Sequence, residues 1–514
     1  MERRREVSTL SEIEGILSYD EQVFMPPGAA QSRAAQRAAL AGIIHDKRTG
    51  AAMQGVVEQC RGLDTSKMTL KAKANVRDAL EAFDVEALKS RDLCEKEARL
   101  ESESFVAWKA SREASDFTLF KLQLQQTFDL AKEVALVTRP TKVALHQEPY
   151  DGALDKFERG MTATRLDAIF AETKQGLKPL LDQVLNAQSA TPQPIHPALI
   201  GGVGTAWEGT EAAQAALGRK VAEAMGYDFS RGRLDVSTHP FTGGAGPRDT
   251  RITTRYSANW LEAFSGTVHE TGHALYEQGR DDVDEDAVGL PSSVALSMGV
   301  HESQSLLWER MVQQSRAFWI YATPLFHKAF PHTRQATPED FYVAANVVQA
   351  GAIRVEADEL TYPLHVFLRF DLERKLFRGE LQVEDVPAFW NAAMKRDLGV
   401  QVDKDAQGCL QDIHWSFGAI GYFPSYTLGA IMAAQLFQAA SAQLPSLDED
   451  IAKGHFAPLR EWLREQVHKK GSIYASPDEL LNSVTGGTGG IDPGPYLEYL
   501  KAKYTDLYKL EPSE

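Results

Sequence analysis

The sequence predicts a mainly α-helical protein with one small β element. Long stretches place apolar residues at intervals of three and four, as in Val76 to Phe83 and Phe117 to Val137, and contain few β-branched runs. One segment breaks this pattern, Asp249 to Ser257 (DTRITTRYS), because its Thr, Ile and Tyr residues suit a pleated strand. We therefore expect a large helical body with a short β-hairpin or small sheet there.

Three loop-like segments interrupt the helical pattern. They are the Pro-rich Thr191 to Pro197, the Gly-rich Phe241 to Pro247, and Thr485 to Pro495, where turns form easily and helices do not. Helical patterning resumes after each loop without a change of composition. We therefore expect one domain over residues 1–514, with two halves, rather than separable modules.

Composition and charge narrow the class of protein. Hydrophobic residues make up 43% and charged residues 25% of the chain, which is typical of a folded globular protein. The formal net charge is −16, whereas a surface for nucleic acid or anionic membrane needs a dense patch of Lys and Arg. We therefore expect neither nucleic acid nor membrane as a partner.

The cysteines and the N-terminal segment indicate a cytoplasmic location. Cys60, Cys94 and Cys409 are far apart and outside any CxxC spacing, which fits a reducing compartment. The stretch from Ser8 to Gln22 is too polar for the apolar part of a signal peptide. No run of eighteen apolar residues predicts a membrane span.

A metal-binding pattern lies directly after the expected strand. Trp260 to Gln278 reads as one amphipathic helix that Gly279 ends. Within it, His269 and His273 stand four residues apart and so share one helical face, where both can reach a single ion. Glu270 beside them can take a proton from water without being a ligand, which is the general-base arrangement of metallopeptidases.

A third ligand candidate follows about thirty residues later. Glu302 lies in His301-Glu302-Ser303-Gln304-Ser305, on a segment from Ser292 to Gln314 that we expect to be helical. Two His and one Glu leave the fourth position of a tetrahedral zinc open, as a catalytic site requires. His301 is an alternative to Glu302, but neighbours on a helix point roughly 100° apart, so only one faces the ion. Cobalt or manganese are possible replacements for zinc.

The sequence resembles the carboxypeptidase Taq family of zinc metallocarboxypeptidases over almost the whole chain. The matching segments are SYDEQVFMPPGAAQSR from Ser18, with Tyr19 where a Trp is common, YDGALDKFERGMT from Tyr150, His239-Pro240-Phe241, DTRIT from Asp249, HETGHALYEQG from His269, HESQS from His301, IRVEADELTY from Ile353, GCLQDIHW from Gly408 and PYLEYLKAKY from Pro495.

This resemblance implies more than the residues alone predict. It implies a helical fold with a deep central groove, similar to neurolysin and angiotensin-converting enzyme, and a homodimer. It also implies removal of single C-terminal residues from peptides that have a free C-terminus, with broad preference and poor cleavage at proline. It favours Glu302 over His301 as the ligand.

The resemblance also assigns further catalytic residues. Hydrolysis builds charge on the scissile carbonyl oxygen, which needs hydrogen-bond donors. In the related helical peptidases a His and a Tyr play this part, which points to His414 and Tyr422, with Tyr426 as a possible replacement for Tyr422.

An exopeptidase must also bind the C-terminal carboxylate, and a guanidinium fits both of its oxygens. From the residues alone, Arg354 has two possible roles: it binds the substrate carboxylate, or it forms an ion pair with Asp358, four residues further along a helix. The resemblance favours carboxylate binding. Arg251 is the second candidate. Asp358 and Glu359 are candidates to accept a hydrogen bond from a ligand imidazole, but the sequence places neither.

Two other functions remain open. The same scaffold can serve a dipeptidyl carboxypeptidase or an oligoendopeptidase, since the metal pattern fixes the chemistry and not the place of cleavage. A non-catalytic, metal-stabilised peptide-binding protein is the third interpretation. Glu270 argues against it, because a structural metal site has no use for that carboxylate.

Overall fold

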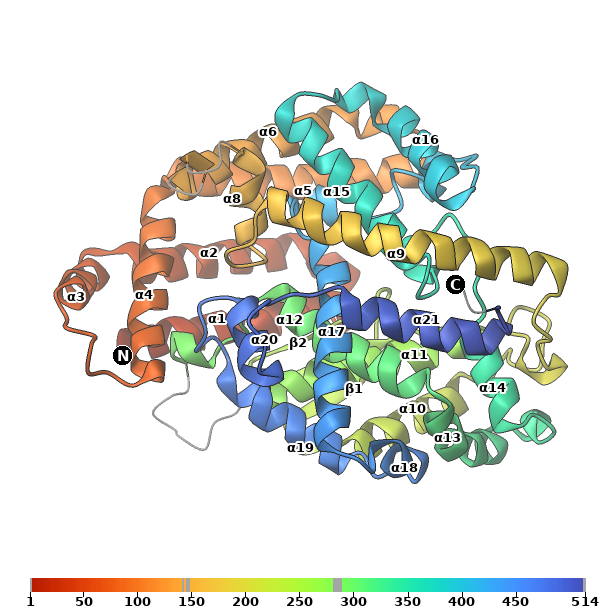
Figure 1. The fold of residues 1–514 in the computed structure, drawn as a ribbon. Helices are drawn as coiled ribbons and strands as arrows, with labels where there is room; N and C mark the ends of the chain where they lie inside the picture. The colour runs from red at the N-terminus through yellow and green to blue at the C-terminus, as the bar shows by residue number, and fades with distance from the viewer. Residues whose placement is uncertain (1, 141–142, 145–147, 281–288, 512–514) are drawn as a thin grey trace.

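The protein is a helical body built around one long buried helix (Figure 1). The structure is a computed structural model that describes residues 2–140, 143–144, 148–280 and 289–511. The first part of the chain forms helices α1 (Glu2–Val23), α2 (Ala30–Thr49), α3 (Ala51–Arg61), α4 (Leu70–Leu88), α5 (Arg91–Ala114), α6 (Lys121–Thr138), α8 (Pro149–Asp155), α9 (Ala163–Ala190) and α10 (Glu211–Met225).

Three strands and the remaining helices complete the fold. The strands are β1 (Gly232–Val236), β2 (Thr242–Gly244) and β3 (Thr250–Thr254). The helices are α11 (Trp260–Gly279), α12 (Met298–Leu306), α13 (Arg316–Ala329), α14 (Pro338–Ala345), α15 (Tyr362–Arg378), α16 (Val386–Leu398), α17 (Pro424–Gln443), α18 (Leu447–Ala452), α19 (Ala457–Gln466), α20 (Pro477–Thr485) and α21 (Gly494–Tyr508). Among the helices described, none is long and apolar enough to cross a membrane.

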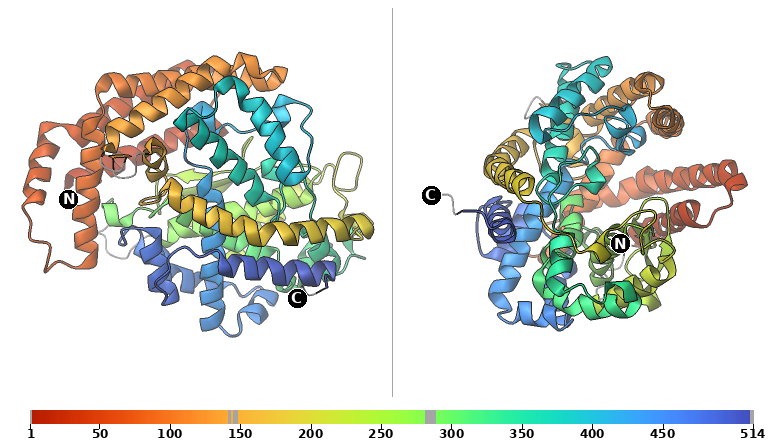
Figure 2. Two further views of the ribbon diagram at one scale, coloured as in Figure 1. Left: turned by 45° about the horizontal axis from the view of Figure 1, so that its top comes forward. Right: turned by 90° about the vertical axis from the view of Figure 1, so that its right-hand side faces the viewer.

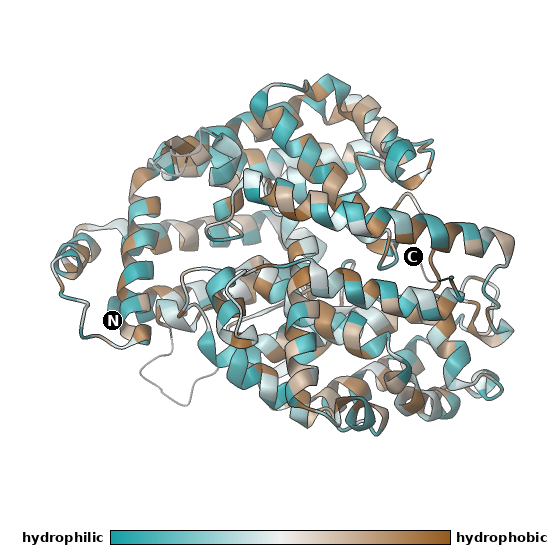
Figure 3. Ribbon diagram, in the orientation of Figure 1, coloured by the Kyte–Doolittle hydropathy of each residue, from teal (hydrophilic) through white to brown (hydrophobic). Residues whose placement is uncertain are grey.

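Helix α17 runs through the middle of the molecule, where its residues are buried on nearly every side (Figure 1). Outer helices are amphipathic instead. In α9 the buried residues Leu166, Ile169, Phe170 and Leu177 recur at helical spacing, and Figure 3 shows polar residues between the apolar ones. Helix α21, near the end of the chain, packs alongside α9 (Figure 2). Helices α1 to α4 lie at one end of the molecule around a small core of their own.

The small sheet has the strand order β1-β3-β2. Strand β3 is central: it pairs parallel with β1, from Gly232 with Thr250 to Val236 with Thr254, and antiparallel with β2. Its residues are mostly buried because β3 packs against helix α11. The strand expected in Asp249 to Ser257 is confirmed, and three strands rather than a two-stranded hairpin form the sheet beside the site.

Two predicted helices differ from the structure at their beginnings. The stretch from Phe117 starts as a 3₁₀ turn, Phe117–Leu119, and α6 begins only at Lys121. The helix expected from Ser292 begins at Met298, where the Ser297 side chain accepts a hydrogen bond from Val300 N and caps it. Beyond Leu306 the same segment continues as a π-helical turn, Leu307–Gln313.

Glycines bring α11, α12 and α17 unusually close together. A Cβ atom on Gly272 of α11 would lie 2.7 Å from both Gln304 O and Ser305 Cα in α12. A Cβ atom on Gly429 of α17 would lie 2.7 Å from the Cβ of Glu302 in α12. No side chain fits at either position, so the missing side chains let the three helices meet around Glu302.

Candidate metal centre

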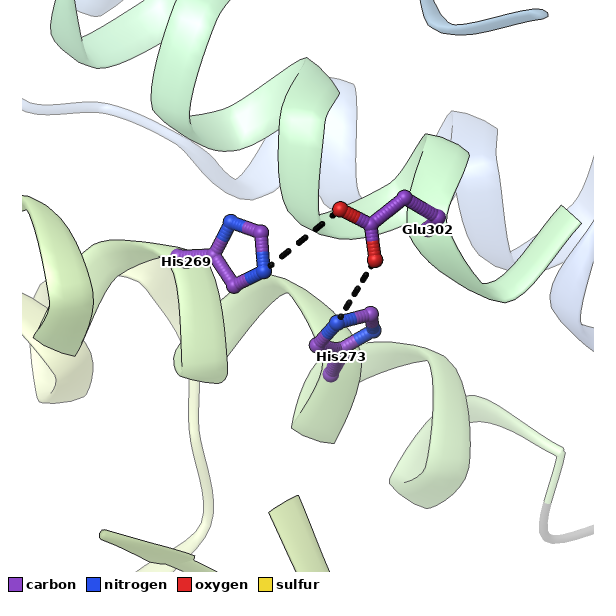
Figure 4. Close-up of side chains that lie close together, drawn as sticks. All are labelled: His269, His273 and Glu302. Carbon is purple, nitrogen blue, oxygen red and sulfur yellow. Dashed lines mark ion pairs between the residues drawn. The ribbon is translucent and has the colours of Figure 1, made fainter. Parts of the chain in front are cut away.

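Two helices place the three predicted ligands around one point. His269 and His273 project from one face of α11, and Glu302 projects toward them from α12 (Figure 4). His269 Nε2 lies 3.8 Å from Glu302 Oε1, and His273 Nε2 lies 3.4 Å from Glu302 Oε2. One ligand atom from each residue falls within 4.8 Å of the other two. The three residues thus form the group of His and carboxylate side chains that the sequence predicts.

The separations of these atoms fit a metal ion. Zinc bonds of 2.0–2.1 Å in tetrahedral geometry hold neighbouring ligand atoms about 3.4 Å apart. The distance from His273 Nε2 to Glu302 Oε2 has this value, and the distance from His269 Nε2 to the other carboxylate oxygen, Oε1, is slightly longer. Two imidazole nitrogens and one carboxylate oxygen are a usual donor set for a catalytic zinc or a similar divalent ion.

The charges around the site also suit a cation. Burial by itself lowers the pKa of His269, but Glu302 and Glu309 outweigh it and raise the pKa to about 9. Burial favours the neutral form of Glu302, yet His269 and His273 outweigh it and lower the pKa of Glu302 to about 2. The carboxylates therefore stay ionised and create a negative potential where a cation would sit.

Both ligand imidazoles are held by a second contact on the far side of the ring. His269 Nδ1 donates to Glu309 Oε2 at 2.7 Å. His273 Nδ1 lies 2.7 Å from His301 Nδ1, and His301 Nε2 donates to Glu277 Oε1 at 2.8 Å. Both ring nitrogens of His301 are thus engaged away from Glu302, and His301 is not one of the three clustered residues.

Neither of the two candidates, Asp358 and Glu359, supports a ligand imidazole. Asp358 accepts hydrogen bonds from the backbone N–H groups of Leu360 and Thr361 at the start of α15. Glu359 Oε2 accepts from Lys503 Nζ at 2.8 Å. Glu309 was not predicted as the partner of a ligand imidazole, and α-helical spacing from Glu302 does not place it, because the chain becomes π-helical at Leu307.

Glu270 lies beside the three clustered residues and is almost fully buried. It is close enough to His269 to raise the pKa of that imidazole. Its Oε2 accepts a hydrogen bond of 2.7 Å from Thr242 Oγ1, in strand β2. The arrangement suits a carboxylate that is held in place and takes part in proton transfer rather than in metal binding.

His414, Tyr422 and Tyr426 lie together next to this site. His414 begins a 3₁₀ turn, His414–Phe417, and its Nε2 lies 3.0 Å from the Tyr426 hydroxyl. The Tyr422 ring is 5.5 Å from the His414 ring and 5.3 Å from the Tyr426 ring. Burial lowers the pKa of His414 to about 3, so its imidazole is neutral.

The two tyrosines differ in what their hydroxyl groups contact. Tyr426 is engaged with His414, whereas among the described residues the Tyr422 hydroxyl has no hydrogen-bond partner. Burial raises the pKa of Tyr422 strongly, and the carboxylates of Glu302 and Glu270 raise it further. Tyr422 therefore keeps its proton and lies near the metal-binding residues.

Arg354 belongs to a buried ion cluster and not to a helical ion pair. It starts a short 3₁₀ turn, Arg354–Glu356, which excludes the alternative of an ion pair with Asp358 on one helix face. Arg354 Nε and Nη2 donate to Asp412 Oδ1 at 3.1 and 2.8 Å, and Nη1 donates to Tyr362 OH at 2.8 Å. Arg369 Nε donates to the other oxygen of Asp412 at 2.7 Å.

This cluster holds two guanidinium groups and one carboxylate. Burial raises the pKa of Asp412, but Arg354 and Arg369 outweigh it and hold the pKa well below its usual range. The surplus positive charge favours an anion nearby. Arg354 also stacks over the ring of Tyr426, 4.6 Å away, which links the cluster to the His414 group. Arg251 pairs instead with Asp249, the residue directly before strand β3, at 2.7 Å.

The helical fold and the site together define a metallopeptidase of the His-Glu-x-x-His type with a downstream glutamate. The comparisons place it more narrowly: residues 1–504 match the family described as carboxypeptidase Taq (M32) metallopeptidase. The chain belongs to this family and is a metallocarboxypeptidase.

Relatives and solved structures match over nearly their full length. Thermostable carboxypeptidase 1 of Thermus thermophilus is 37% identical over 521 residues, which cover 99% of this chain and 98% of that protein. Carboxypeptidase 1 of Bacillus subtilis is 34% identical over 514 residues, with 98% and 97% covered. The crystal structure of the M32 carboxypeptidase from Deinococcus radiodurans R1 superposes with a TM-score of 0.90 at 37% identity, covering 99% of this chain and 98% of that one.

These matches confirm the predicted family, the mainly helical fold and the enzyme class. The deep groove, the likeness to neurolysin and angiotensin-converting enzyme, and the single domain with two halves stay predictions.

Proposed function

We propose that the protein is a zinc-dependent carboxypeptidase that removes single residues from the free C-terminus of peptides, with broad preference for the residue released. The arrangement of His269, His273 and Glu302 supports the metal-dependent hydrolysis, and membership of a carboxypeptidase family supports cleavage at the C-terminus. The donor set favours zinc, and cobalt or manganese are possible replacements.

The residues around the ion have separate roles in this mechanism. A bound zinc supplies Lewis acidity, which polarises the scissile carbonyl and acidifies water. Glu270 accepts the proton of the attacking water and delivers it to the leaving amine. Thr242 occupies one oxygen of that carboxylate, so the other is available for the proton. Tyr422 donates a hydrogen bond to the carbonyl oxygen as charge builds there.

His414 and Tyr426 complete this part of the proposal. Their mutual contact of 3.0 Å gives Tyr426 a partner within the protein, which favours Tyr422 over Tyr426 as the donor to substrate. The same contact engages Nε2 of the neutral His414 ring, so His414 can act as the second donor to the carbonyl oxygen only if this nitrogen carries the proton and turns from Tyr426 to the substrate.

Arg354 is proposed to bind the C-terminal carboxylate of the substrate. Three hydrogen bonds to Asp412 and Tyr362 fix its guanidinium, and two of its five N–H groups remain for a further acceptor. Arg369 supplies the surplus positive charge that keeps an anion favourable at this place. The pairing of Arg251 with Asp249 makes Arg251 the weaker candidate.

The alternatives differ from this proposal in where a peptide is cut. A dipeptidyl carboxypeptidase releases two residues at a time, and an oligoendopeptidase does not need a free C-terminus. A metal-stabilised binding protein holds peptides without cutting them.

The family resemblance implies a homodimer, and the composition implies a cytoplasmic location. Both remain proposals, and light scattering of the purified protein tests the homodimer.

The test compares two peptides of one sequence, one with a free and one with an amidated C-terminus. Wild type, Glu270→Gln and the control Glu262→Gln, an exposed carboxylate on the same helix, are assayed after metal analysis. We expect single residues to be released from the free peptide only. Glu270→Gln should keep its zinc and lose about 100-fold or more of the activity. Release of dipeptides or internal cleavage would replace the exopeptidase assignment, and bound zinc without any cleavage would favour a binding protein.

A further inference from the structure

A chain of side chains leads from His273 away from the metal centre. His273 Nδ1 lies 2.7 Å from His301 Nδ1, and His301 Nε2 lies 2.8 Å from Glu277 Oε1. The other oxygen of Glu277 pairs with Arg280, whose guanidinium also donates to Ser293 O. The four side chains of this chain are each at most 17% exposed, so water competes little for their contacts. They are His273, His301, Glu277 and Arg280.

The carboxylate at the outer end decides the direction of every hydrogen bond in the chain. Ionised Glu277 can only accept, so the proton of the neutral His301 ring must lie on Nε2. His301 Nδ1 then carries a lone pair and can only accept. Since it faces His273 Nδ1, that nitrogen must carry the proton of the His273 ring. The lone pair of His273 is therefore on Nε2, the atom that faces Glu302.

We propose that His301 and Glu277 are positioning residues that hold His273 in its metal-binding tautomer and so set the affinity of the enzyme for its metal. This inference rests on the proposed metal centre at His269, His273 and Glu302. His301, the rejected alternative to Glu302 as a ligand, acquires a role of its own: it passes the effect of the Glu277 carboxylate to a ligand that the carboxylate does not touch.

The two ligand imidazoles are thus supported differently. His269 Nδ1 contacts the carboxylate of Glu309 directly, whereas His273 reaches Glu277 only through a second imidazole. A ring that loses its Nδ1 partner can adopt the other tautomer or rotate, and either change withdraws the lone pair from the ion. Loss of such outer contacts typically lowers metal affinity about 10- to 100-fold.

The first measurement is the dissociation constant for zinc, obtained by competition with a chelator, for the full-length enzyme and four variants. His301→Leu removes the acceptor for His273, and Glu277→Ala removes the acceptor for His301. His468→Leu is the matched control. His301 and His468 both pack on the Tyr276 ring, with centroids 5.1 and 5.3 Å away, but His468 Nε2 contacts Gln304 rather than a ligand imidazole. Glu302→Gln reports on the metal centre itself. Circular dichroism checks that each variant is folded.

We expect zinc to bind about 10- to 100-fold more weakly to His301→Leu and Glu277→Ala and unchanged to His468→Leu. Wild-type affinity in both His301→Leu and Glu277→Ala, with Glu302→Gln impaired, would overturn the positioning role and leave the metal centre intact. If Glu302→Gln binds zinc as tightly as wild type, the proposed centre itself is wrong.

A second measurement does not need any variant to fold. Nitrogen-15 NMR of the zinc-loaded wild-type enzyme, labelled at histidine, distinguishes imidazole nitrogens that carry a proton from those that carry a lone pair. We expect His301 to hold its proton on Nε2 and His273 to hold its proton on Nδ1. A proton on His301 Nδ1 would contradict the proposal.

Discussion

Thr242 Oγ1 lies 2.7 Å from Glu270 Oε2, so a residue of the small sheet holds the carboxylate of the metal-binding helix. Thr242 opens strand β2, where it pairs with Ile252 of the central strand, and Ile252 is fully buried. The same hydroxyl also lies 3.1 Å from the backbone oxygen of Glu270. The sheet therefore serves the site through one hydroxyl group that fixes the orientation of Glu270.

Replacing this hydroxyl by a methyl group should slow the reaction without removing the metal. Thr242→Val keeps the shape of the side chain but loses a hydrogen bond to a charged group, which contributes about 1.5–3 kcal/mol. We expect kcat to fall about 10- to 100-fold while KM and zinc content stay unchanged. Thr242→Ser, which retains the hydroxyl, should recover most of kcat. Equal losses in the valine and serine variants would show that the hydroxyl is not the cause.

Adding one methyl group at Gly429 should disturb the metal site by displacing Glu302. A Cβ atom there would lie 2.7 Å from the Cβ of Glu302, so Gly429→Ala must push Glu302 out of place. We expect weaker zinc binding in chelator competition. Gly55, inside α3 with open space around it, is the control, and Gly55→Ala should raise the free energy of unfolding by about 1 kcal/mol and leave zinc affinity as it is. Unchanged affinity in Gly429→Ala would mean that α17 can move away.

Neutralising Asp412 should destabilise the whole protein. Asp412→Asn leaves Arg354 and Arg369, both almost fully buried, without a counter-charge. Breaking a buried ion pair from one side costs about 3–5 kcal/mol. The midpoint of urea unfolding should fall accordingly, whereas Glu449→Gln, which breaks an exposed pair with Lys453, should leave it unchanged. A midpoint like that of wild type would show that the two arginines are solvated.

Two buried glutamates should make the stability depend on pH. Burial raises the pKa of Glu158 and of Glu373 from 4.5 to about 7. Between these values the folded protein keeps protons that the unfolded chain has lost, so the free energy of unfolding falls as pH rises from 4.5 to 7. A shift of this size corresponds to about 3 kcal/mol for each group.

Urea unfolding at several pH values in this window measures the effect. Glu158→Gln and Glu373→Gln mimic the protonated acid and should each remove part of the slope, and the exposed Glu449→Gln should not. The activity of Glu373→Gln should be measured as well, because Glu373 contacts a segment that carries proposed catalytic residues. Glu373 accepts hydrogen bonds from Trp415 Nε1 and Gly421 N, which lie within the segment from His414 to Tyr422. A slope identical to wild type in both variants would contradict the raised pKa values.

The sequence predicts the parts of the site that lie close together along the chain. His269 and His273 occupy one helical face, and four-residue spacing is enough to place them, with Glu270 beside them. The resemblance favours Glu302 over His301 and carboxylate binding by Arg354, and it assigns His414 and Tyr422. The strand at Thr250–Thr254 follows from its β-branched residues.

The parts that join distant segments are not visible in spacing. Thr242 and Glu270 are 28 residues apart, and Arg354 and Asp412 are 58 apart, so only the folded structure reveals either pair. The alternative pair of Arg354 with Asp358 shows why. Four-residue spacing brings charges together only in an α-helix, and Arg354 stands in a single 3₁₀ turn. Likewise, both His301 and Glu302 contact α11, and only the folded structure reveals that Glu302 faces Nε2 of His269 and of His273, whereas His301 contacts Nδ1 of His273.

The bare positions at Gly272 and Gly429 have a thermodynamic consequence for the protein without metal. Each glycine inside a helix makes that helix less stable than alanine would, by about 1 kcal/mol, because the unfolded chain is freer there. The two glycines thus lower the free energy of unfolding, but they allow α11, α12 and α17 to pack closely enough to place Glu302 beside the two histidines. A bound ion offsets this loss of stability, since any ligand that binds only the folded state raises the free energy of unfolding as its concentration rises. The metal-free enzyme is thereby the form most exposed to unfolding and proteolysis.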